Sequence, residues 1–384
     1  MTPAARVQAA IVLLDEILAG QPAEQALTSW ARRSRFAGSK DRAAIRDHVF
    51  DALRCRRSFA ALGGAETGRG LMLGSIRAQG LEGEALFDGT PYGPEPVAPG
   101  EEGRPPASGA EAGDISDWLW PEFSRSLQDQ AEPGAQYLRS RAPVFLRTNL
   151  LKTNRTALIE ALSSDGITAR SHPLSPTAIE IAEGARRLRN AQAFRLGQFE
   201  FQDAASQAVV DALPLQEGHK VLDFCAGGGG KTLAMGAQAK LDLVAHDAAP
   251  QRMRDLPDRA SRAGLSVRIV PDLPVEDAFD LVLCDAPCSG SGSWRRAPEG
   301  KWLLTPERLE TLTQTQDTIL DRAASLVAPA GALAYATCSV LKTENEDRVA
   351  AFLERNSAWS CDTYRRWPLV GGGDGFFLAI FTRS

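Results

Sequence analysis

The stretch "KVLDFCAGGGGKT", residues 220–232, decides how the second half of the chain folds. A short apolar run is followed directly by four consecutive glycines, and then by Lys231 and Thr232. The run predicts a buried strand, and the glycines predict a turn that lets the backbone approach a ligand closely. The residues after the turn predict the start of a helix, whose N-terminus favours polar or anionic groups.

The same alternation of strand and helix continues to the end of the chain. Further apolar runs are separated by helical stretches, and with the first they lie at 220–224, 241–246, 266–270, 279–284, 331–337 and 375–382. Continuous apolar strands between helices indicate a buried, mainly parallel sheet. Residues 204–384 are therefore predicted to form a doubly wound α/β domain.

The first half of the chain shows three other patterns. Residues 5–20 and 39–62 place apolar side chains at helical spacing, with Ser39 as the expected N-cap of the second stretch. An acidic, Pro/Gly-rich stretch reads as a flexible linker, and 116–130 reads as a capped helix. Short strands around a helix then predict a small α+β module. The expected segments are 1–87 (helical), 88–138 (linker and connecting helix), 139–203 (α+β) and 204–384 (α/β).

The charge is unevenly distributed along the chain. The net charge of −5 argues against indiscriminate coating of nucleic acid. Residues 30–60 nevertheless hold nine Lys/Arg against three Asp, which suggests a local polyanion-binding surface. The six cysteines form no C-x-x-C pair, and no apolar run approaches 18 residues. Without a signal-peptide pattern, this composition predicts a cytoplasmic protein in a reducing compartment.

Four acids follow successive predicted strands, and they bear on the ligand of the glycine turn. These are Asp223, Asp247, Asp272 and Asp285. In a parallel sheet they share the carboxyl edge, where open α/β sheets bind ligands, and Asp247 is placed to accept hydrogen bonds from ribose hydroxyls. One alternative is a P-loop NTPase, although Cys225 stands where that motif needs its first glycine. The other is a Rossmann-like methyltransferase that binds S-adenosylmethionine.

Two cysteines stand at strand ends on the same predicted edge. Cys288 follows a proline in "LVLCDAPCSGSGSWRR", residues 281–296, and Cys338 ends "ALAYATC" in residues 332–340. An ordinary buried thiol suits Cys55, Cys284 and Cys361 better than it suits these two. The four histidines show no metal-ligand spacing. The pattern points to thiol chemistry at the ligand edge of the sheet.

Three motifs together resemble a known family. "DFCAGGGGKT", "DAPCSGSGSWRR…KW" and "YATCSVLKTENED" are similar to motifs of the Sun/Fmu-type RNA cytosine-5 methyltransferases, which include the bacterial 16S rRNA methyltransferase B group. The resemblance covers 141–384 well and extends less specifically to 1–60, where "DRAAIRDHVFDALR" resembles the family's NusB-like RNA-binding domain. It implies a Rossmann-like class I methyltransferase domain, a preceding α+β module and an N-terminal helical domain.

The resemblance also implies roles for individual residues. Cys338 would be the nucleophile and Cys288 a second catalytic cysteine, with Asp285 and Lys231 beside the reacting base. The residues implied to bind S-adenosylmethionine are Cys225, Ala226, Gly227, Gly228, Gly229, Gly230, Lys231, Asp247, Arg252, Asp272 and Asp285. The chain departs from the family's Cys-Ala-Ala-Pro-Gly-Gly-Lys, because Gly227-Gly228 replace Ala-Pro. Loss of a proline that fixes φ predicts a more mobile loop.

The chemistry of cytosine explains why such a site would need a thiol. Carbon 5 is too weak a nucleophile to attack a sulfonium methyl group. A thiolate that adds to carbon 6 makes carbon 5 enamine-like, which is covalent catalysis. After methyl transfer the carbon 5 proton must leave and the thiolate must be expelled, and a second cysteine suits that release.

RNA is the expected partner, with rRNA as the expected substrate, and we expect no metal, no membrane and a monomer. Stacking aromatics and cations recognise single-stranded RNA, a pattern met in Trp294, Arg295, Arg296, Lys301 and Trp302. The candidate RNA contacts are Arg42, Arg46, Arg54, Arg56, Arg186, Arg187, Arg295 and Arg296. The remaining alternatives are a tRNA methyltransferase, a P-loop NTPase and a non-catalytic rRNA assembly factor.

Overall fold

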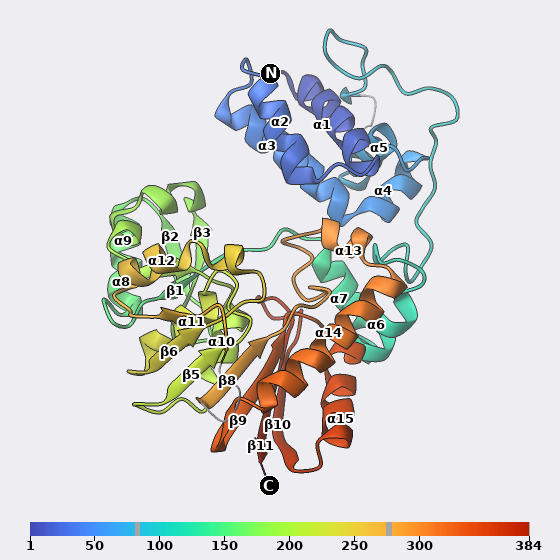
Figure 1. Ribbon diagram of the computed structural model, residues 1–384. Coiled ribbons are helices and arrows are strands. Elements are labelled where there is room, and N and C mark those ends of the chain that lie inside the picture. The colour runs from blue at the N-terminus through green and yellow to red at the C-terminus, as the bar shows by residue number, and fades with distance from the viewer. Residues whose placement is uncertain (81–84, 274–278, 384) are drawn as a thin grey trace. The chain divides into compact units, whose positions relative to one another are not determined.

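The structure is a computed structural model that describes residues 1–80, 85–273 and 279–383 (Figure 1). The chain divides into two compact units. The first contains residues 1–141 together with 294–303, and the second contains residues 142–293 together with 304–384. The first unit takes in both the expected helical segment and the expected linker. The division into four separate domains stays a prediction.

The first unit is helical, as the apolar spacing of its sequence predicts. Side chains such as Val7, Leu14, Leu53 and Leu71 from different helices meet in one core. The expected helix over residues 39–62 is interrupted at Cys55, between α3 and α4. The helices of this unit are α1 (Pro3–Leu18), α2 (Ala23–Arg33), α3 (Ser39–Arg54), α4 (Arg56–Gly63), α5 (Gly68–Ala78), α6 (Trp120–Leu127), α7 (Ala131–Leu138) and α13 (Glu299–Leu303).

Two helix starts differ from the sequence expectation. Ser39 is the first residue of α3 and not its N-cap, which is Gly38. The carboxylate of Asp41 accepts a hydrogen bond from the Gly38 backbone N–H at 3.2 Å. The side chain that caps the helix start therefore belongs to a residue of the helix itself. The helix expected over 116–130 begins at Trp120 and has no side-chain cap.

The acidic stretch 88–114 contains no α-helix or strand in the part of the chain that the structure describes. Ion pairs tie it to the helices and to itself. Arg69 of α5 lies 2.6 Å from the Glu101 carboxylate, and Arg104 lies 2.6 Å from that of Glu111. The Arg69 hydrogen bond lowers the pKa of Glu101 to about 2. The stretch is therefore held against its own unit by charge pairing.

The second unit begins with a four-stranded antiparallel sheet in the order β2-β3-β1-β4. This sheet is the small α+β module that the sequence predicts, and Leu146, Leu158, Ile179 and Phe199 form its core. Strand β2 was not predicted, because its four residues are too few to show an alternation of apolar and polar side chains. Its elements are β1 (Val144–Thr148), α8 (Arg155–Ser164), β2 (Thr168–Ser171), β3 (Ala178–Glu183), α9 (Gln192–Arg195) and β4 (Phe199–Phe201).

A seven-stranded sheet follows, in the order β10-β11-β9-β8-β5-β6-β7. Strands β5 to β9 pair in parallel, whereas β11 is antiparallel to both β9 and β10. All six predicted strands are present, and β10 is an additional edge strand. The elements are α10 (Ala204–Asp211), β5 (Lys220–Asp223), α11 (Gly230–Gln238), β6 (Asp242–Ala245), α12 (Leu256–Ala263), β7 (Arg268–Ile269), β8 (Phe279–Asp285), α14 (Pro306–Ala324), β9 (Val327–Thr337), α15 (Glu346–Arg355), β10 (Trp359–Trp367) and β11 (Phe376–Arg383).

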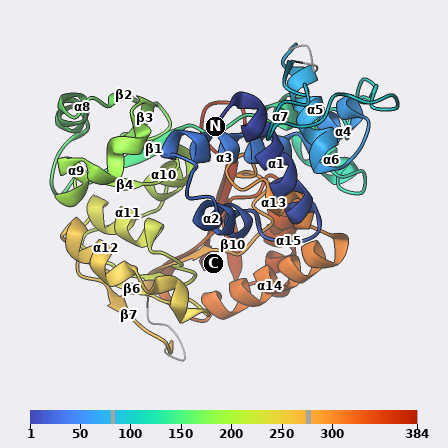
Figure 2. The same ribbon diagram turned by 90° about the horizontal axis from the view of Figure 1, so that it is seen from above.

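Helices cover both faces of this sheet, as a doubly wound fold requires (Figure 2). Leu320 of α14 and Phe352 of α15 pack on one face, against Val282 and Phe377. Val209 of α10 and Met235 of α11 pack on the other face. Because both faces are buried, the strands need apolar residues at consecutive positions, which is the pattern in their sequence. The predicted α/β fold class is confirmed.

Candidate active site

The carboxyl edge of the parallel strands gathers most of the predicted site residues. Asp223 ends β5, Asp285 ends β8, and Cys338 follows β9 directly. Asp247 lies two residues beyond β6, and the exposed Asp272 lies three residues beyond β7. Since these strands run in parallel, the sheet brings these side chains to one edge.

The glycine loop between β5 and α11 needs glycine at two positions. Gly227 and Gly229 have φ angles of +50° and +79°, in the left-handed region that side chains disfavour. A Cβ atom added at Gly229 would lie 2.2 Å from Leu256 Cδ1. The glycines therefore let the loop turn tightly against α12.

Asp247 holds this loop from the neighbouring strand. Its carboxylate is 3% exposed, and it accepts hydrogen bonds from the backbone N–H groups of Gly227 at 2.8 Å and Ala249 at 2.9 Å. Arg252 lies 3.2 Å from the same carboxylate. Two predicted cofactor residues, Asp247 and Arg252, thus pair with each other beside the loop, and their roles toward a ligand stay predictions.

Asp223 lies beneath the loop and is 1% exposed. The Thr232 hydroxyl donates to its Oδ2 at 2.6 Å, while its Oδ1 is buried and has no hydrogen-bond donor within the described residues. Burial, with a smaller effect of the Asp285 charge, raises the pKa of the Asp223 carboxyl to about 7. The site thus contains a buried acceptor with unused hydrogen-bonding capacity.

Lys231 pairs with Asp285 inside the site. Its ammonium donates to Asp285 Oδ2 at 2.7 Å, and the two side chains are 7% and 33% exposed. Burial lowers the pKa of the Lys231 ammonium, but the Asp285 charge and hydrogen bond, together with the nearby Cys338, raise it further, so that it stays above its ordinary value. A P-loop lysine must reach phosphates, whereas this ammonium is neutralised by Asp285, which argues against the NTPase alternative.

The two strand-end cysteines lie together. The Sγ atoms of Cys288 and Cys338 are 3.4 Å apart, and both thiols are free. The hydrogen bond to Cys338 and burial raise the pKa of the Cys288 thiol above its ordinary value, and the Glu344 charge adds to this. Cys55 and Cys284 are buried, as expected of structural thiols, whereas Cys361 is only half-buried. The geometry thus singles out one pair of cysteines at the edge that carries the acids.

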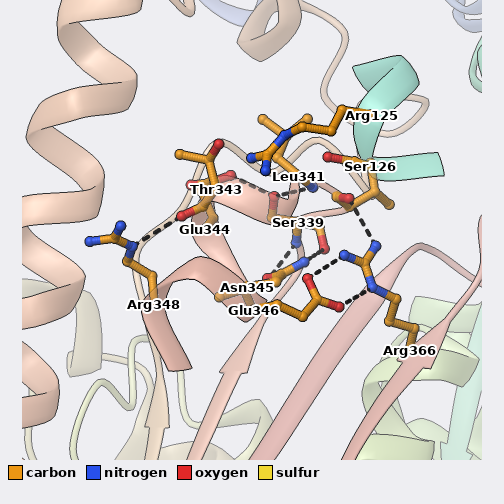
Figure 3. A network of polar contacts seen from close by, with 12 residues as sticks. Arg125, Ser126, Ser339, Leu341, Thr343, Glu344, Asn345, Glu346, Arg348 and Arg366 are labelled. Atoms are coloured by element: carbon orange, nitrogen blue, oxygen red, sulfur yellow. Dashed lines mark hydrogen bonds and ion pairs between the residues drawn. The ribbon is translucent and has the colours of Figure 1, made fainter. Parts of the chain in front are cut away.

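Sequence reasoning missed the polar network behind this pair (Figure 3). Glu344 is fully buried and binds the serines that follow both cysteines, Ser289 and Ser339. Asn345 donates to the Ser339 carbonyl at 3.0 Å and accepts from the Thr337 hydroxyl at 2.6 Å. The only sequence signal was the charged run "KTENED", which reads equally well as a solvated turn.

The predicted basic-aromatic cluster after Cys288 does not face solvent as a whole. Trp294, Arg295 and Lys301 are each 1% exposed. Lys301 donates to the Arg54 carbonyl at 2.9 Å, and the Trp302 indole donates to that of Leu53. These side chains fold into the helical unit because backbone carbonyls at the end of α3 satisfy them.

The structure therefore corrects two predicted RNA contacts. Arg54 is 6% exposed and donates to the Arg295 carbonyl at 2.8 Å, so neither Arg54 nor Arg295 is presented to a polyanion. Arg46 and Arg56 pair with Glu24 at 2.8 Å and Glu66 at 2.6 Å.

The remaining predicted RNA contacts are exposed. Arg186, Arg187 and Arg296 lie at the surface. Arg42 is exposed too, and its side chain forms no hydrogen bond or ion pair within the described residues. With Arg32, Arg35 and Arg46 it lines a hollow of about 710 Å³ on the helical unit.

Two further features of the described part of the chain concern metal-binding clusters and membrane-spanning helices. No three His, Cys, Asp or Glu side chains there lie close enough together to hold a metal ion. No helix there is long and apolar enough to cross a membrane.

Comparisons with known family models match two stretches of the chain. The family model described as "16S rRNA methyltransferase RsmB/F" matches residues 210–382, and the one described as "Methyltr_RsmF/B-like, ferredoxin-like domain" matches residues 115–186. Ribosomal RNA small subunit methyltransferase B of Yersinia pseudotuberculosis serotype O:1b is 33% identical over 278 residues. The match covers 68% of this chain and 65% of that relative, which is less than two thirds of the relative's length.

Solved structures share the fold. The crystal structure of PH0851 is 22% identical, with a TM-score of 0.76, and the match covers 100% of this chain and 99% of that one. A methyltransferase homolog protein from Pyrococcus horikoshii is 22% identical, with a TM-score of 0.62, over 72% of this chain and 97% of that one. NSun6 from the same organism is 16% identical, with a TM-score of 0.61, over 70% and 98% of the two chains.

Proposed function

Because the chain belongs to the RsmB/F family of 16S rRNA methyltransferases, we propose that it methylates carbon 5 of a cytosine in RNA, with 16S rRNA as the substrate and S-adenosylmethionine as the methyl donor. The observation that carries this proposal is the pair of thiols, 3.4 Å apart, at the sheet edge that also holds the Lys231–Asp285 pair. All six cysteines of the chain are free, which suits a reducing compartment. We therefore infer that the protein acts in the cytoplasm.

The residues around the glycine loop fit S-adenosylmethionine, which supplies a methyl group on a positively charged sulfonium sulfur. Three carboxyl groups, those of Asp223, Asp247 and Asp285, lie at this edge, where open α/β sheets bind their ligands. The orphan Oδ1 of Asp223 has unused acceptor capacity, and the glycines leave positions 227–230 of the loop without side chains. We assign cofactor binding to the loop with Asp247, Arg252, Asp272 and Asp285.

Cys338 is the proposed nucleophile. Its thiolate forms a bond to carbon 6 of cytosine, and the electron pair of the carbon 5–carbon 6 double bond makes carbon 5 nucleophilic toward a methyl group. Lys231 fixes the Asp285 carboxyl group, which we propose hydrogen-bonds the cytosine ring. A target cytosine in folded RNA must leave its stack to reach this thiol.

Cys288 is the proposed assistant in release. Once carbon 5 carries the methyl group, its proton leaves, the double bond forms again and the Cys338 thiolate is expelled. Spacing along the sequence leaves the order of the two cysteines open, since other cytosine methyltransferases attack with the Pro-Cys thiol. We propose attack by Cys338 on the strength of the family resemblance.

The two roles give opposite results in a trapping experiment. Cys288→Ser still attacks and methylates but releases slowly, so a protein–RNA adduct that survives denaturing electrophoresis accumulates. Cys338→Ser forms no adduct and no methylated product, because serine is a far poorer nucleophile at neutral pH. The double variant is the control and forms no adduct. Accumulation of the adduct in Cys338→Ser, but not in Cys288→Ser, would reverse the assignment.

A further inference from the structure

One buried carboxylate touches both cysteine loops. Ser289 follows Cys288, and Ser339 follows Cys338. Glu344 Oε1 accepts the Ser289 backbone N–H at 2.8 Å, and its Oε2 accepts the hydroxyl groups of Ser289 and Ser339. A single side chain thus bonds to the residue that follows each thiol.

A second side chain, that of Gln316, forms hydrogen bonds on the other side of Cys288. Gln316 of α14 donates through Nε2 to Glu344 Oε1 at 3.1 Å and to the Pro287 carbonyl at 3.0 Å. The residues immediately before and after Cys288 are therefore both tied to the Gln316–Glu344 pair. Glu344 is 0% exposed, and no Lys or Arg forms an ion pair with it in the part of the chain described. Its charge is satisfied by N–H and O–H donors alone, which a buried carboxylate requires.

The carboxylate is itself held in place. Glu344 ends a short 3₁₀ helix, Lys342–Glu344, and its carbonyl accepts the Tyr335 hydroxyl at 2.7 Å. Ser339 also accepts the Leu341 N–H at 3.0 Å, and Asn345 donates to the Ser339 carbonyl (Figure 3). Side chains fixed from several directions in this way set the geometry of their neighbours closely.

We propose that Glu344 is a positioning residue for both cysteines: it holds the Cys288 and Cys338 loops together so that the two sulfurs face each other. The role deepens the proposed function and rests on it, since it takes these thiols to be the reacting pair. Glu344 does not itself need to touch substrate.

The negative charge of Glu344 has a second effect, because it influences which of the two thiols keeps its proton. Cys288 faces Cys338 at the end of β9, Glu344 on the 3₁₀ helix and the buried Tyr335 on β9. The hydrogen bond to Cys338, burial and the Glu344 charge all raise the pKa of Cys288.

On the other side of the sulfur pair, Cys338 interacts with the Lys231 ammonium of α11, which is paired with Asp285 of β8. The Glu344 anion beside Cys288 favours a Cys288 thiol that keeps its proton.

Glu344→Gln tests the role, with Glu346→Gln as its matched control. Glutamine keeps the shape but has one acceptor oxygen in place of two, so its NH₂ group must face either the Ser289 N–H and Gln316 donors at the Oε1 position or the two serine hydroxyl groups at the Oε2 position. Glu346 lies two residues away, and its carboxylate pairs with Arg366 and not with a cysteine loop. The measurements are the single-turnover rate of RNA methylation, the Kd for S-adenosylmethionine, and the pH dependence of iodoacetamide alkylation at Cys288, followed by peptide mass spectrometry.

Glu344→Gln is expected to lower the methylation rate by about tenfold or more, with little change in the Kd. The midpoint of Cys288 alkylation moves to lower pH, because an anion has been removed. Glu346→Gln leaves the rate and the midpoint unchanged. If Glu344→Gln does not fold, Ser289→Ala with Ser339→Ala removes both hydroxyl donors, and the same loss of rate is expected.

Three results separate this proposal from its premise. A wild-type rate with an unchanged alkylation midpoint in Glu344→Gln overturns the positioning role. An equal loss in Glu346→Gln overturns it as well, because general weakening of the segment would then explain both. If the wild-type protein methylates no RNA, the proposed function fails, while the alkylation profiles still decide the effect of Glu344 on Cys288.

Discussion

Arg259 connects the glycine loop to the small antiparallel sheet, and its removal tests how that loop is held. Its guanidinium, on α12, donates to the Gly228 carbonyl and to Glu200 of β4, the latter at 2.8 and 3.1 Å. Gly228 stands where the resembling family has proline. A loop without that proline is more flexible unless something else restrains it, and Arg259 supplies such a restraint.

The magnitude follows from the contact. A hydrogen bond to a charged group contributes roughly 1.5–3 kcal/mol net, and the lower end applies here because the Arg259 side chain is 23% exposed. Since about 1.4 kcal/mol is tenfold in affinity, Arg259→Met is expected to raise the Kd for S-adenosylmethionine roughly tenfold. Isothermal titration calorimetry measures this directly.

Arg262→Met is the matched control. Arg262 also pairs with Glu200, at 2.5 Å, but among the residues that the structure describes it has no hydrogen bond to the loop. Its removal should therefore leave the Kd nearly unchanged. Wild-type affinity in Arg259→Met, or an equal loss in Arg262→Met, would refute the idea that the contact with Gly228 restrains the loop.

Three further predictions follow from other residues. Asp223→Asn removes a carboxyl group that keeps its proton in the folded protein up to about pH 7 but loses it near pH 3.8 when unfolded. Stability falls as pH rises through that window in the wild type, and urea unfolding at pH 5 and pH 8 should show a smaller fall in the variant. Asp247→Ala strands the Gly227 and Ala249 N–H groups and should weaken S-adenosylmethionine binding by roughly 1–3 kcal/mol in calorimetry. Arg42→Glu with Arg46→Glu should weaken RNA binding and flatten its salt dependence without affecting S-adenosylmethionine, whereas unchanged RNA affinity would mark a solvated face.

The sequence predicted the parallel strands of the sheet better than the outermost strand, β10. Each buried parallel strand is an apolar run that ends near an acid or a cysteine, so both the strands and the shared edge could be read from it. Strand β10 was missed because "WSCDTYRRW" mixes polar and aromatic residues, as an edge strand with one neighbour can.

Arginine and glutamate side chains were harder to place. The sequence suggests that Arg54 and Arg295 are surface charges. Both are buried in the structure, and the Arg54 guanidinium donates to the Arg295 carbonyl. Glu344 lies in a charged run, and only the fold brings it to two serines 50 residues apart. Periodicity reports which face of an element is apolar, but not which polar groups find partners in the interior.

The central claim is methylation of carbon 5 through Cys338, and nucleoside analysis tests it most directly. Unmodified 16S rRNA is incubated with the protein and methyl-labelled S-adenosylmethionine, digested to nucleosides and examined by mass spectrometry. The account predicts label in 5-methylcytidine with the wild type and none with Cys338→Ser. Label in another nucleoside, or equal label from Cys338→Ser, would contradict it.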